Sequence, residues 1–324
     1  MSGFHKDILT LDAPKVVDEL AAVVERQVTR RLNRQGVVIG VSGGIDSSTC
    51  VALACKALGP ERVLGVAMPE QDSSPESYEL AKALSKQYGF ELILENLTPA
   101  LTGLSCYPRR DEAVKRIYPD YTPDCKFNIV LPANILQQDR LNIFRINIEY
   151  PDGRRDTKRI PPKQYLQIVA ASNMKQRVRM LMLYYHGEQR NYAVIGTGQK
   201  NEHDQGFFVK WGDGGADLKP IAHLYKTQVY QVARALGVPQ SILDRTPTTD
   251  TYSMETTQED FYYSLPFLAM DLLHLAWKDP DTGAGEAAEA MDLTQDQVER
   301  VWKDFERKEN TTEYLRLMPL HWDD

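Results

Sequence analysis

Short apolar runs and longer amphipathic stretches alternate along the first third of the chain. Gly36–Val41 and Val63–Met68 are almost continuously apolar and rich in β-branched residues, a pattern typical of strands that are buried on both faces. Glu91–Leu97 is expected to form a third strand. Apolar residues recur at helical spacing around these runs. The pattern therefore predicts helices at 12–35, 47–58 and 74–88.

This alternation of strands and helices predicts a parallel sheet with helices on both faces. Tyr192–Ile195 is expected to add another buried strand, which a glycine-rich stretch follows. Helical patterns resume at 167–186, 224–236, 257–276 and 294–308. We therefore predict an α/β fold, a doubly wound parallel sheet, in a single domain that spans residues 1–324.

Residues 100–165 interrupt the rhythm of strands and helices. Asn142–Tyr150 alternates polar and apolar side chains, and Pro151–Arg154 carries turn residues. Thr157–Ile160 is expected to return as the partner strand. We interpret this region as an inserted β-hairpin within the domain.

The charge balance argues against a broad nucleic-acid-binding surface. The formal net charge is -7 and the sequence pI is about 5.5, whereas nucleic-acid binding usually needs a basic face. The 4 cysteines form no CxxC pair, so reduced thiols are expected rather than a zinc knuckle or a redox dithiol. No stretch approaches the apolar length of a membrane span, and the first residues lack an apolar signal core. We expect a cytoplasmic protein that binds neither membranes nor nucleic acid.

The segment Ser42–Ser48 (SGGIDSS) directly follows the first predicted strand. Ligands of parallel sheets bind at this end of a strand, and glycine N–H groups at a helix N-terminus suit phosphate. The serines add hydroxyl donors, whereas Asp46 would repel phosphate unless a magnesium ion bridged the two. An ordinary tight turn is the alternative, but it accounts poorly for a whole segment that suits one chemistry. Neither a P-loop nor a GxGxxG pattern is present.

SGGIDSS resembles the signature of the N-type ATP pyrophosphatases. That resemblance implies an adenine nucleotide alpha hydrolase-like fold and cleavage of ATP between its α- and β-phosphates. It also implies that a carboxylate is adenylated, after which a nitrogen nucleophile displaces AMP. ATP would be the co-substrate and Mg²⁺ the cofactor.

Three later segments resemble the NAD synthetases within this family: Asn173–Met180 (NMKQRVRM), Gly196–Glu202 (GTGQKNE) and Gly206–Asp217 (GFFVKWGDGGAD). Pro220, Leu224, Lys226 and Pro247-Thr248 continue the match. The resemblance covers roughly residues 15–98 and 166–260 and implies amidation of deamido-NAD to NAD, with ATP and ammonia consumed and AMP and pyrophosphate released.

The resemblance assigns roles by position in the sequence. Deamido-NAD would contact Arg177, Lys210 and Asp217, and magnesium would be held by Asp46 and Glu202. Of these, Asp46 and Lys210 would act with Lys226 in the catalytic step, where metal and lysines neutralise charge on the phosphates. ATP would contact Ser42, Gly43, Gly44, Asp46, Ser47, Ser48, Thr197, Lys226 and Thr248. Taken one at a time, most of these residues are better explained as surface or turn residues than as ligand-binding residues. Their joint occurrence, in order and at fitting spacing, favours a binding site.

Several features depart from the family pattern. The segment after Pro247 (TTDTYSMETTQED) is altered, and only Arg316 and Pro319 match a C-terminal basic segment that helps relatives bind deamido-NAD. The alternatives are therefore a paralogous ligase that amidates another carboxylate, or a non-catalytic nucleotide-binding protein on the same scaffold. No glutaminase domain is expected, so free ammonia would be the donor unless a separate subunit delivered it. The resemblance also implies a homodimer, whose contact the amphipathic N-terminal helix could supply.

Overall fold

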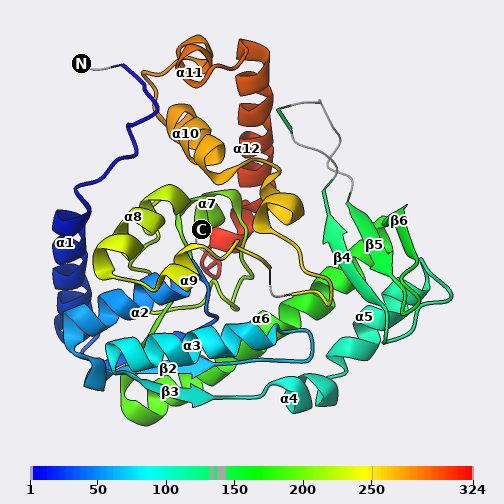
Figure 1. Ribbon diagram of the computed structural model, residues 1–324, viewed down its shortest axis with the longest axis horizontal. Coiled ribbons are helices and arrows are strands. Elements are labelled where there is room, and N and C mark those ends of the chain that lie inside the picture. Colours follow the sequence, from blue (N-terminus) through cyan, green and yellow to red (C-terminus); the bar gives the residue numbers. More distant parts are fainter. Residues whose placement is uncertain (1–2, 132–134, 137–143, 250, 323–324) are drawn as a thin grey trace.

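The computed structural model describes residues 3–131, 135–136, 144–249 and 251–322. A parallel sheet forms its centre (Figure 1), with the strand order β3-β2-β1-β7. Val38 of β1 lies opposite Leu64 of β2 on one side and Val194 of β7 on the other. β1 and β2 are buried along almost their whole length, which explains their lack of polar alternation. The four strands are β1 (Gly36–Gly40), β2 (Val63–Ala67), β3 (Glu91–Leu94) and β7 (Tyr192–Ile195).

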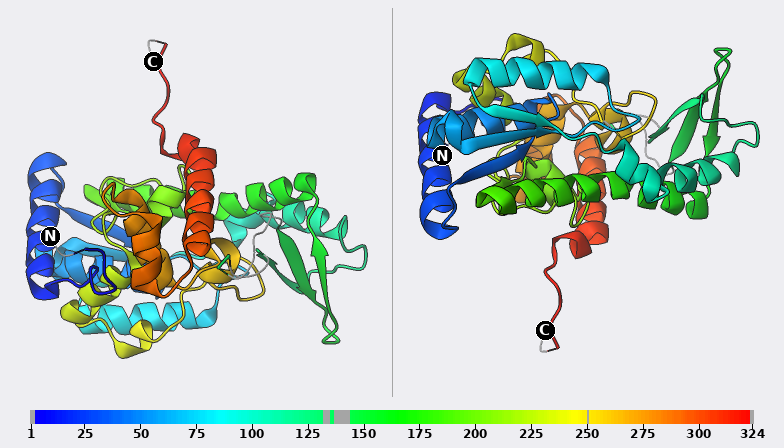
Figure 2. Two further views of the ribbon diagram at one scale, coloured as in Figure 1. Left: turned by 90° about the horizontal axis from the view of Figure 1, so that it is seen from above. Right: turned by 90° about the horizontal axis from the view of Figure 1, so that it is seen from below.

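Helices cover both faces of this sheet, as Figure 2 shows. Val37 and Ile39 of β1 point into a core with the helices of one face, while Val38 packs against Leu183 on the other face. The first face carries α2 (Ile45–Leu58) and α3 (Pro75–Tyr88), with α1 (Ala13–Arg26) and α8 (Lys226–Leu236) packed against α2. The second face carries the long α6 (Pro162–Arg190). The predicted doubly wound α/β fold is confirmed.

The region between β3 and α6 holds more than the predicted hairpin. The hairpin itself is present as β5 (Arg145–Glu149) and β6 (Arg155–Arg159), although residues 142–143 lie outside the described residues. A third antiparallel strand, β4 (Lys126–Val130), pairs with β5. Two helices precede it, α4 (Thr98–Gly103) and α5 (Cys106–Lys115). The sequence did not reveal these three elements, because α4 and β4 are short and α5 buries the charged Arg110 among its apolar residues, which obscures its period.

Helices of the C-terminal part build a second core beside the sheet. This core joins α10 (Phe267–Lys278), α11 (Ala284–Met291) and α12 (Gln295–Arg316). Two short helices, α7 (Lys200–Gln205) and α9 (Gln240–Leu243), lie nearer the sheet, and 317–322 extends away from the body (Figure 2). Single turns η1 (Gln27–Arg31), η2 (Pro60–Arg62) and η3 (Glu259–Tyr263) complete the described elements.

Two predicted helices were too long. The stretch 257–276 breaks at Ser264, which has φ +58°, and at Pro266, which cannot donate a helical hydrogen bond. The helix predicted over 12–35 ends at Arg26, and a π-helical turn follows it. Asp12 caps the start of α1 as expected. The cysteines are free, as predicted, and all of them are buried.

Candidate functional site

The segment Ser42–Ser48 connects the carboxyl end of β1 to the first turn of α2. Gly43 has φ +71°, and a Cβ atom there would lie 2.8 Å from the carbonyl oxygen of Ser77 in α3. Glycine alone combines this backbone angle with so close an approach. The turn therefore presents backbone N–H groups and the positive end of the α2 dipole at the edge of the sheet.

The serine hydroxyls of this turn bond within the turn itself. The Oγ atoms of Ser42 and Ser47 are 3.2 Å apart, and the Gly44 N–H donates to the Ser42 Oγ at 3.3 Å. Ser42 is exposed, whereas Ser48 is fully buried and its Oγ has no hydrogen-bond partner among the described residues. A phosphate oxygen at the turn would give these hydroxyls a stronger, charged acceptor.

A buried lysine lies behind Asp46. The Lys226 ammonium, at the start of α8, is 2.5 Å from the Asp46 Oδ2 atom, and the Lys226 side chain has no exposed surface. Burial alone would lower the pKa of Lys226, but Asp46 and Glu202 reverse this effect and raise it. The lysine therefore stays charged and neutralises Asp46.

Glu202 brings a second carboxylate to this cluster. It lies on α7, where its Oε2 atom accepts a hydrogen bond from the Gln199 N–H at 3.0 Å. Burial, and then repulsion by Asp46, raise the pKa of Glu202 to about 8, although Lys226 opposes the shift. The Asp46 Oδ1 atom is buried and has no hydrogen-bond partner among the described residues. Two crowded carboxylates and an unsatisfied oxygen fit the requirements of a divalent cation.

A cavity of about 850 Å³ opens beside the turn. It extends from the carboxyl ends of β1 and β7 along α6 to the last turns of α12. Of the residues predicted to bind ligands, this cavity is lined by Ser42, Gly44, Asp46, Ser47, Thr197, Glu202, Thr248, Arg177 and Lys210. Four predicted residues lie outside its lining, namely Gly43, Ser48, Lys226 and Asp217. Gly43 and Ser48 belong to the turn itself, and Lys226 lies behind it.

The residues predicted to bind the acceptor occupy different surroundings. Lys210 donates hydrogen bonds of 2.8 Å to the carbonyl oxygens of Tyr314 and Leu317 at the end of α12. Arg177 donates to the Lys210 carbonyl at 3.3 Å and is exposed. Asp217 accepts from the Val194 N–H at 2.8 Å and so pairs with the edge of β7. Arg177 and Lys210 thus lie together at the cavity wall, whereas Asp217 lies beside the sheet.

Several basic residues without an assigned role also line the cavity, among them Arg179, Lys219 and Arg245. Arg245 donates to the carbonyl oxygens of Ser42 and Gly43 and to the Ser77 Oγ, which clamps the turn against α3. Burial lowers the pKa of Lys219 even though Asp213 lies nearby. Arg179 stands inside the matched segment Asn173–Met180, and Arg245 precedes Pro247-Thr248 directly. For Arg179 and Arg245, this proximity to matched residues was the only signal in the sequence.

Residues 246–249 and 251–258, which we call the strap, border the cavity on the side of the inserted sheet. The Met254 N–H donates to the Phe127 carbonyl at 3.0 Å, and the Phe127 N–H donates to the Ser253 Oγ at 3.0 Å. Tyr252 is buried, with its ring 5.7 Å from that of Phe127. The strap therefore docks on the outer edge of β4, a strand that the sequence did not predict.

A buried ion cluster holds the strap from below. The Lys175 ammonium is 2.9 Å from Glu70, 2.6 Å from Asp72 and 2.9 Å from the carbonyl oxygen of Thr251. Arg110 of α5 also pairs with Asp72. The cluster joins α6, the loop after β2, α5 and the strap. These ion pairs and hydrogen bonds therefore link the segments that form this side of the cavity.

The ligand crevice of an open parallel sheet lies where the strand order reverses. Here the chain builds β1, β2 and β3 outward and then adds β7 on the other side of β1, so the reversal falls between β1 and β7. The turn Ser42–Ser48, which we call the phosphate turn, follows β1 at this point, and Thr197 follows β7. Fold and site together define an α/β protein that binds the phosphates of a nucleotide.

Comparison with known proteins narrows this class. The NAD synthase family model matches residues 16–115 and 131–316. The NH(3)-dependent NAD(+) synthetase of Rhizobium rhizogenes is 46% identical over 319 residues, covering 98% of this chain and 96% of that protein. The protein of the same name from Rhizobium meliloti is 47% identical over 316 residues, covering 98% and 94%. The chain belongs to the NAD synthase family.

Solved structures agree on the fold. The NH3-dependent NAD synthetase of Campylobacter jejuni superimposes with a TM-score of 0.60 at 20% identity, covering 96% of this chain and 99% of that one. The NMN synthetase of Francisella tularensis gives a TM-score of 0.59, also at 20% identity, covering 96% and 98%. The fold is therefore adenine nucleotide alpha hydrolase-like. Within the described residues, no helix has the length and apolar character needed to cross a membrane.

Proposed function

We propose that the chain is a carbon–nitrogen ligase that amidates deamido-NAD to NAD with ammonia and ATP, releasing AMP and pyrophosphate. The observation that carries this proposal is a single cavity in which the phosphate turn, with Asp46, faces the wall formed by Arg177 and Lys210. Its volume of about 850 Å³ falls in the upper part of the range for small-molecule sites. Such a cavity can bring a nucleotide triphosphate next to a large anionic acceptor.

The roles of the residues follow from their positions. The N–H groups and hydroxyls of the phosphate turn bind the triphosphate, and Arg245 keeps the turn in place. Asp46 and Glu202 would hold magnesium, which would neutralise charge on the phosphates. Lys226 holds Asp46 from behind at 2.5 Å. The acceptor carboxylate can then attack the α-phosphorus, which releases pyrophosphate, and ammonia displaces AMP from the resulting adenylated carboxylate.

The cation fits these residues without a dedicated protein cage. Magnesium is commonly bound through one or two carboxylates together with substrate phosphates. Asp46 and Glu202 supply such a pair, and no cluster of three or more His, Cys, Asp or Glu suited to a metal occurs among the described residues. The metal site is therefore complete only when ATP is present.

The acceptor can be identified by direct assay. Purified protein is incubated with ATP, Mg²⁺, an ammonium salt and either deamido-NAD or the shorter nicotinate mononucleotide. We expect NAD, AMP and pyrophosphate in equal amounts with deamido-NAD. Turnover with the mononucleotide alone would favour the paralogous ligase, and ATP binding without pyrophosphate release would favour a non-catalytic protein.

A homodimer completes the proposal. The apolar face of α1, which suggested a dimer contact, packs inward on α2 and α8. We place the contact instead on α6, where Leu166, Leu181 and Tyr185 are 66%, 61% and 54% exposed. These side chains recur at helical spacing. The cytoplasmic location stays a prediction.

A further inference from the structure

Glu202 is carried by a helix too short to be stable alone. α7 has 6 residues, Lys200–Gln205, whereas isolated helices below roughly 12 residues are marginal in water. Its first turn is fixed by Gln199, whose side chain accepts from the Asn201 N–H at 2.7 Å while its own N–H donates to Glu202. The position of the Glu202 carboxylate therefore depends on what holds the other end of α7.

The carbonyl groups at that other end have identifiable partners. The Glu202 carbonyl accepts from the Phe207 N–H at 2.8 Å, within a turn that Gly206 closes with φ +76°. The Gln205 carbonyl accepts from the Tyr262 hydroxyl at 2.7 Å. The carbonyls of His203 and Asp204 accept from the Arg316 guanidinium at 3.3 and 3.1 Å. For the Asp204 carbonyl, Arg316 is the one donor recorded among the described residues.

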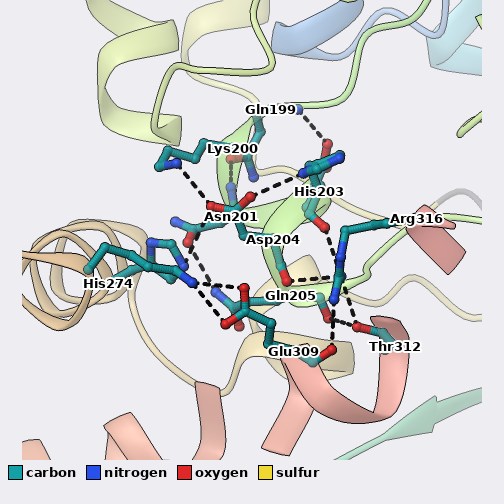
Figure 3. A network of polar contacts seen from close by, with 12 residues as sticks. Gln199, Lys200, Asn201, His203, Asp204, Gln205, His274, Glu309, Thr312 and Arg316 are labelled. Atoms are coloured by element: carbon teal, nitrogen blue, oxygen red, sulfur yellow. Dashed lines mark hydrogen bonds and ion pairs between the residues drawn. The ribbon is translucent and has the colours of Figure 1, made fainter. Parts of the chain in front are cut away.

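Figure 3 shows Arg316 at the junction of α7 and α12. Besides its bonds to α7, it donates to the Thr312 Oγ1 at 3.2 Å and to the Glu309 carbonyl at 2.7 Å. The packing is close here, because a Cβ atom on Gly206 would come within 2.2 Å of Thr312. A cation at a helix C-terminus also interacts favourably with the helix dipole. The two terminal nitrogens of the guanidinium thus join the two helices.

We propose that Arg316 is a positioning residue, which caps α7 from the end of α12 and thereby fixes Glu202 for metal binding. This inference rests on the proposed function. It differs from the role suggested by the family resemblance, in which the C-terminal basic segment binds the dinucleotide. Among the described residues, the hydrogen bonds that Arg316 donates go to α7 and to its own helix.

The test compares Arg316→Ala with Arg300→Ala. Arg300 lies on the same helix and also donates to backbone carbonyls, those of Ile135 and Leu136 at 3.2 and 3.4 Å, but its recorded bonds do not involve α7. We expect Arg316→Ala to raise the Mg²⁺ concentration for half-maximal activity roughly 10-fold, at the lower end of the effect of losing an outer partner of a metal ligand. The KM for deamido-NAD should keep its wild-type value, and Arg300→Ala should match the wild type in both.

Amide hydrogen exchange of residues 200–207 gives a second readout that needs no turnover. We expect faster exchange in Arg316→Ala than in Arg300→Ala, with or without Mg²⁺ and ATP. A higher KM for deamido-NAD with unchanged exchange and Mg²⁺ dependence would overturn the proposal, as would equal behaviour of the two variants. If Arg316→Ala fails to fold, Arg316→Lys is judged by the same criteria. Absence of NAD formation by the wild type would contradict the proposed function but leave the exchange experiment decisive for Arg316.

Discussion

Asp46 and Lys226 form an ion pair that is largely buried. Lys226 has no exposed surface, and the Asp46 side chain is 17% exposed. Removing one partner from a buried pair typically costs about 3–5 kcal/mol, because the other charge is left without compensation. The pair therefore fixes the geometry of the turn. Substitution of either residue alone is expected to destabilise the fold.

His274 predicts a loss of stability in acid. It is fully buried on α10, with its Nδ1 atom 3.1 Å from the Tyr225 hydroxyl. Burial lowers the pKa of His274 from 6.5 to about 4, although Asp204 opposes the shift. The unfolded chain therefore takes up a proton before the folded chain does, and stability falls as the pH drops from 6.5 to 4. The loss is on the order of 3 kcal/mol, at about 1.4 kcal/mol for each pH unit.

Urea unfolding between pH 7 and pH 4 measures this effect. His274→Gln should flatten the pH dependence of the free energy of unfolding over that range. His5→Gln, at an exposed position, should retain the wild-type slope. An unchanged slope in His274→Gln would show that His274 does not titrate differently in the folded protein.

The sequence revealed those site residues that lie in one continuous segment. SGGIDSS directly follows a buried strand, so its chemistry and its place at the sheet edge could be predicted together. Lys226 lies 180 residues from Asp46, and it was found only through the resemblance. Arg245 and the contacts of Arg316 with α7 were missed, because their partners are backbone carbonyls of distant segments.

At the scale of elements, the strap and β4 depend on each other. The NAD synthase family model passes over residues 116–130, which include β4. The strap is also a segment in which the sequence departs from the family pattern. Because the strap docks on β4 through Tyr252, Ser253 and Met254, the two departures form one structural change.

Truncating Tyr252 should loosen the strap. A large aromatic side chain lost from a core typically costs about 3–5 kcal/mol, and here that cost falls on the segment that carries Thr248. We expect Tyr252→Ala to raise the KM for ATP and to speed proteolytic cleavage within 246–258. Tyr252→Phe keeps the ring packing against Phe127 and should behave as the wild type. Equal values of KM for ATP in the two variants would rule out this role for the strap.

The predictability of elements followed their length and period. The strands β1, β2 and β7 and the helices α2, α3 and α8 were predicted closely, because their patterns are continuous. β4 and α7 were missed, because β4 buries the polar Asn128 and the buried residues of α7 are the polar Asn201 and Gln205, so neither shows an apolar pattern. α7 is held by Gln199, which caps its first turn, and by Arg316, which donates to carbonyl groups near its last turn. Both residues lie outside Lys200–Gln205, so the helix cannot be predicted from its own residues.

At the scale of the whole molecule, α6 supports the sheet on one face and leaves apolar side chains in solvent on the other. If α6 forms the dimer contact, Leu181→Glu should place a charge in it and shift the protein towards monomers. Leu104→Glu, at a 49% exposed position on the inserted region, should leave the dimer intact. Sedimentation velocity separates the outcomes. A monomeric wild type, or an unaffected Leu181→Glu, would contradict the proposed contact.

Formation of AMP by Asp46→Asn tests the central claim most directly. The substitution keeps the shape of the side chain and removes the charge that faces Lys226 and the phosphates. With deamido-NAD, ATP, Mg²⁺ and ammonium, we expect AMP formation to fall at least about 100-fold. Asp18→Asn, a change at a 73% exposed carboxylate on α1, should retain the wild-type rate. AMP formation at the wild-type rate by correctly folded Asp46→Asn would contradict the assignment of this turn as the site where ATP is activated.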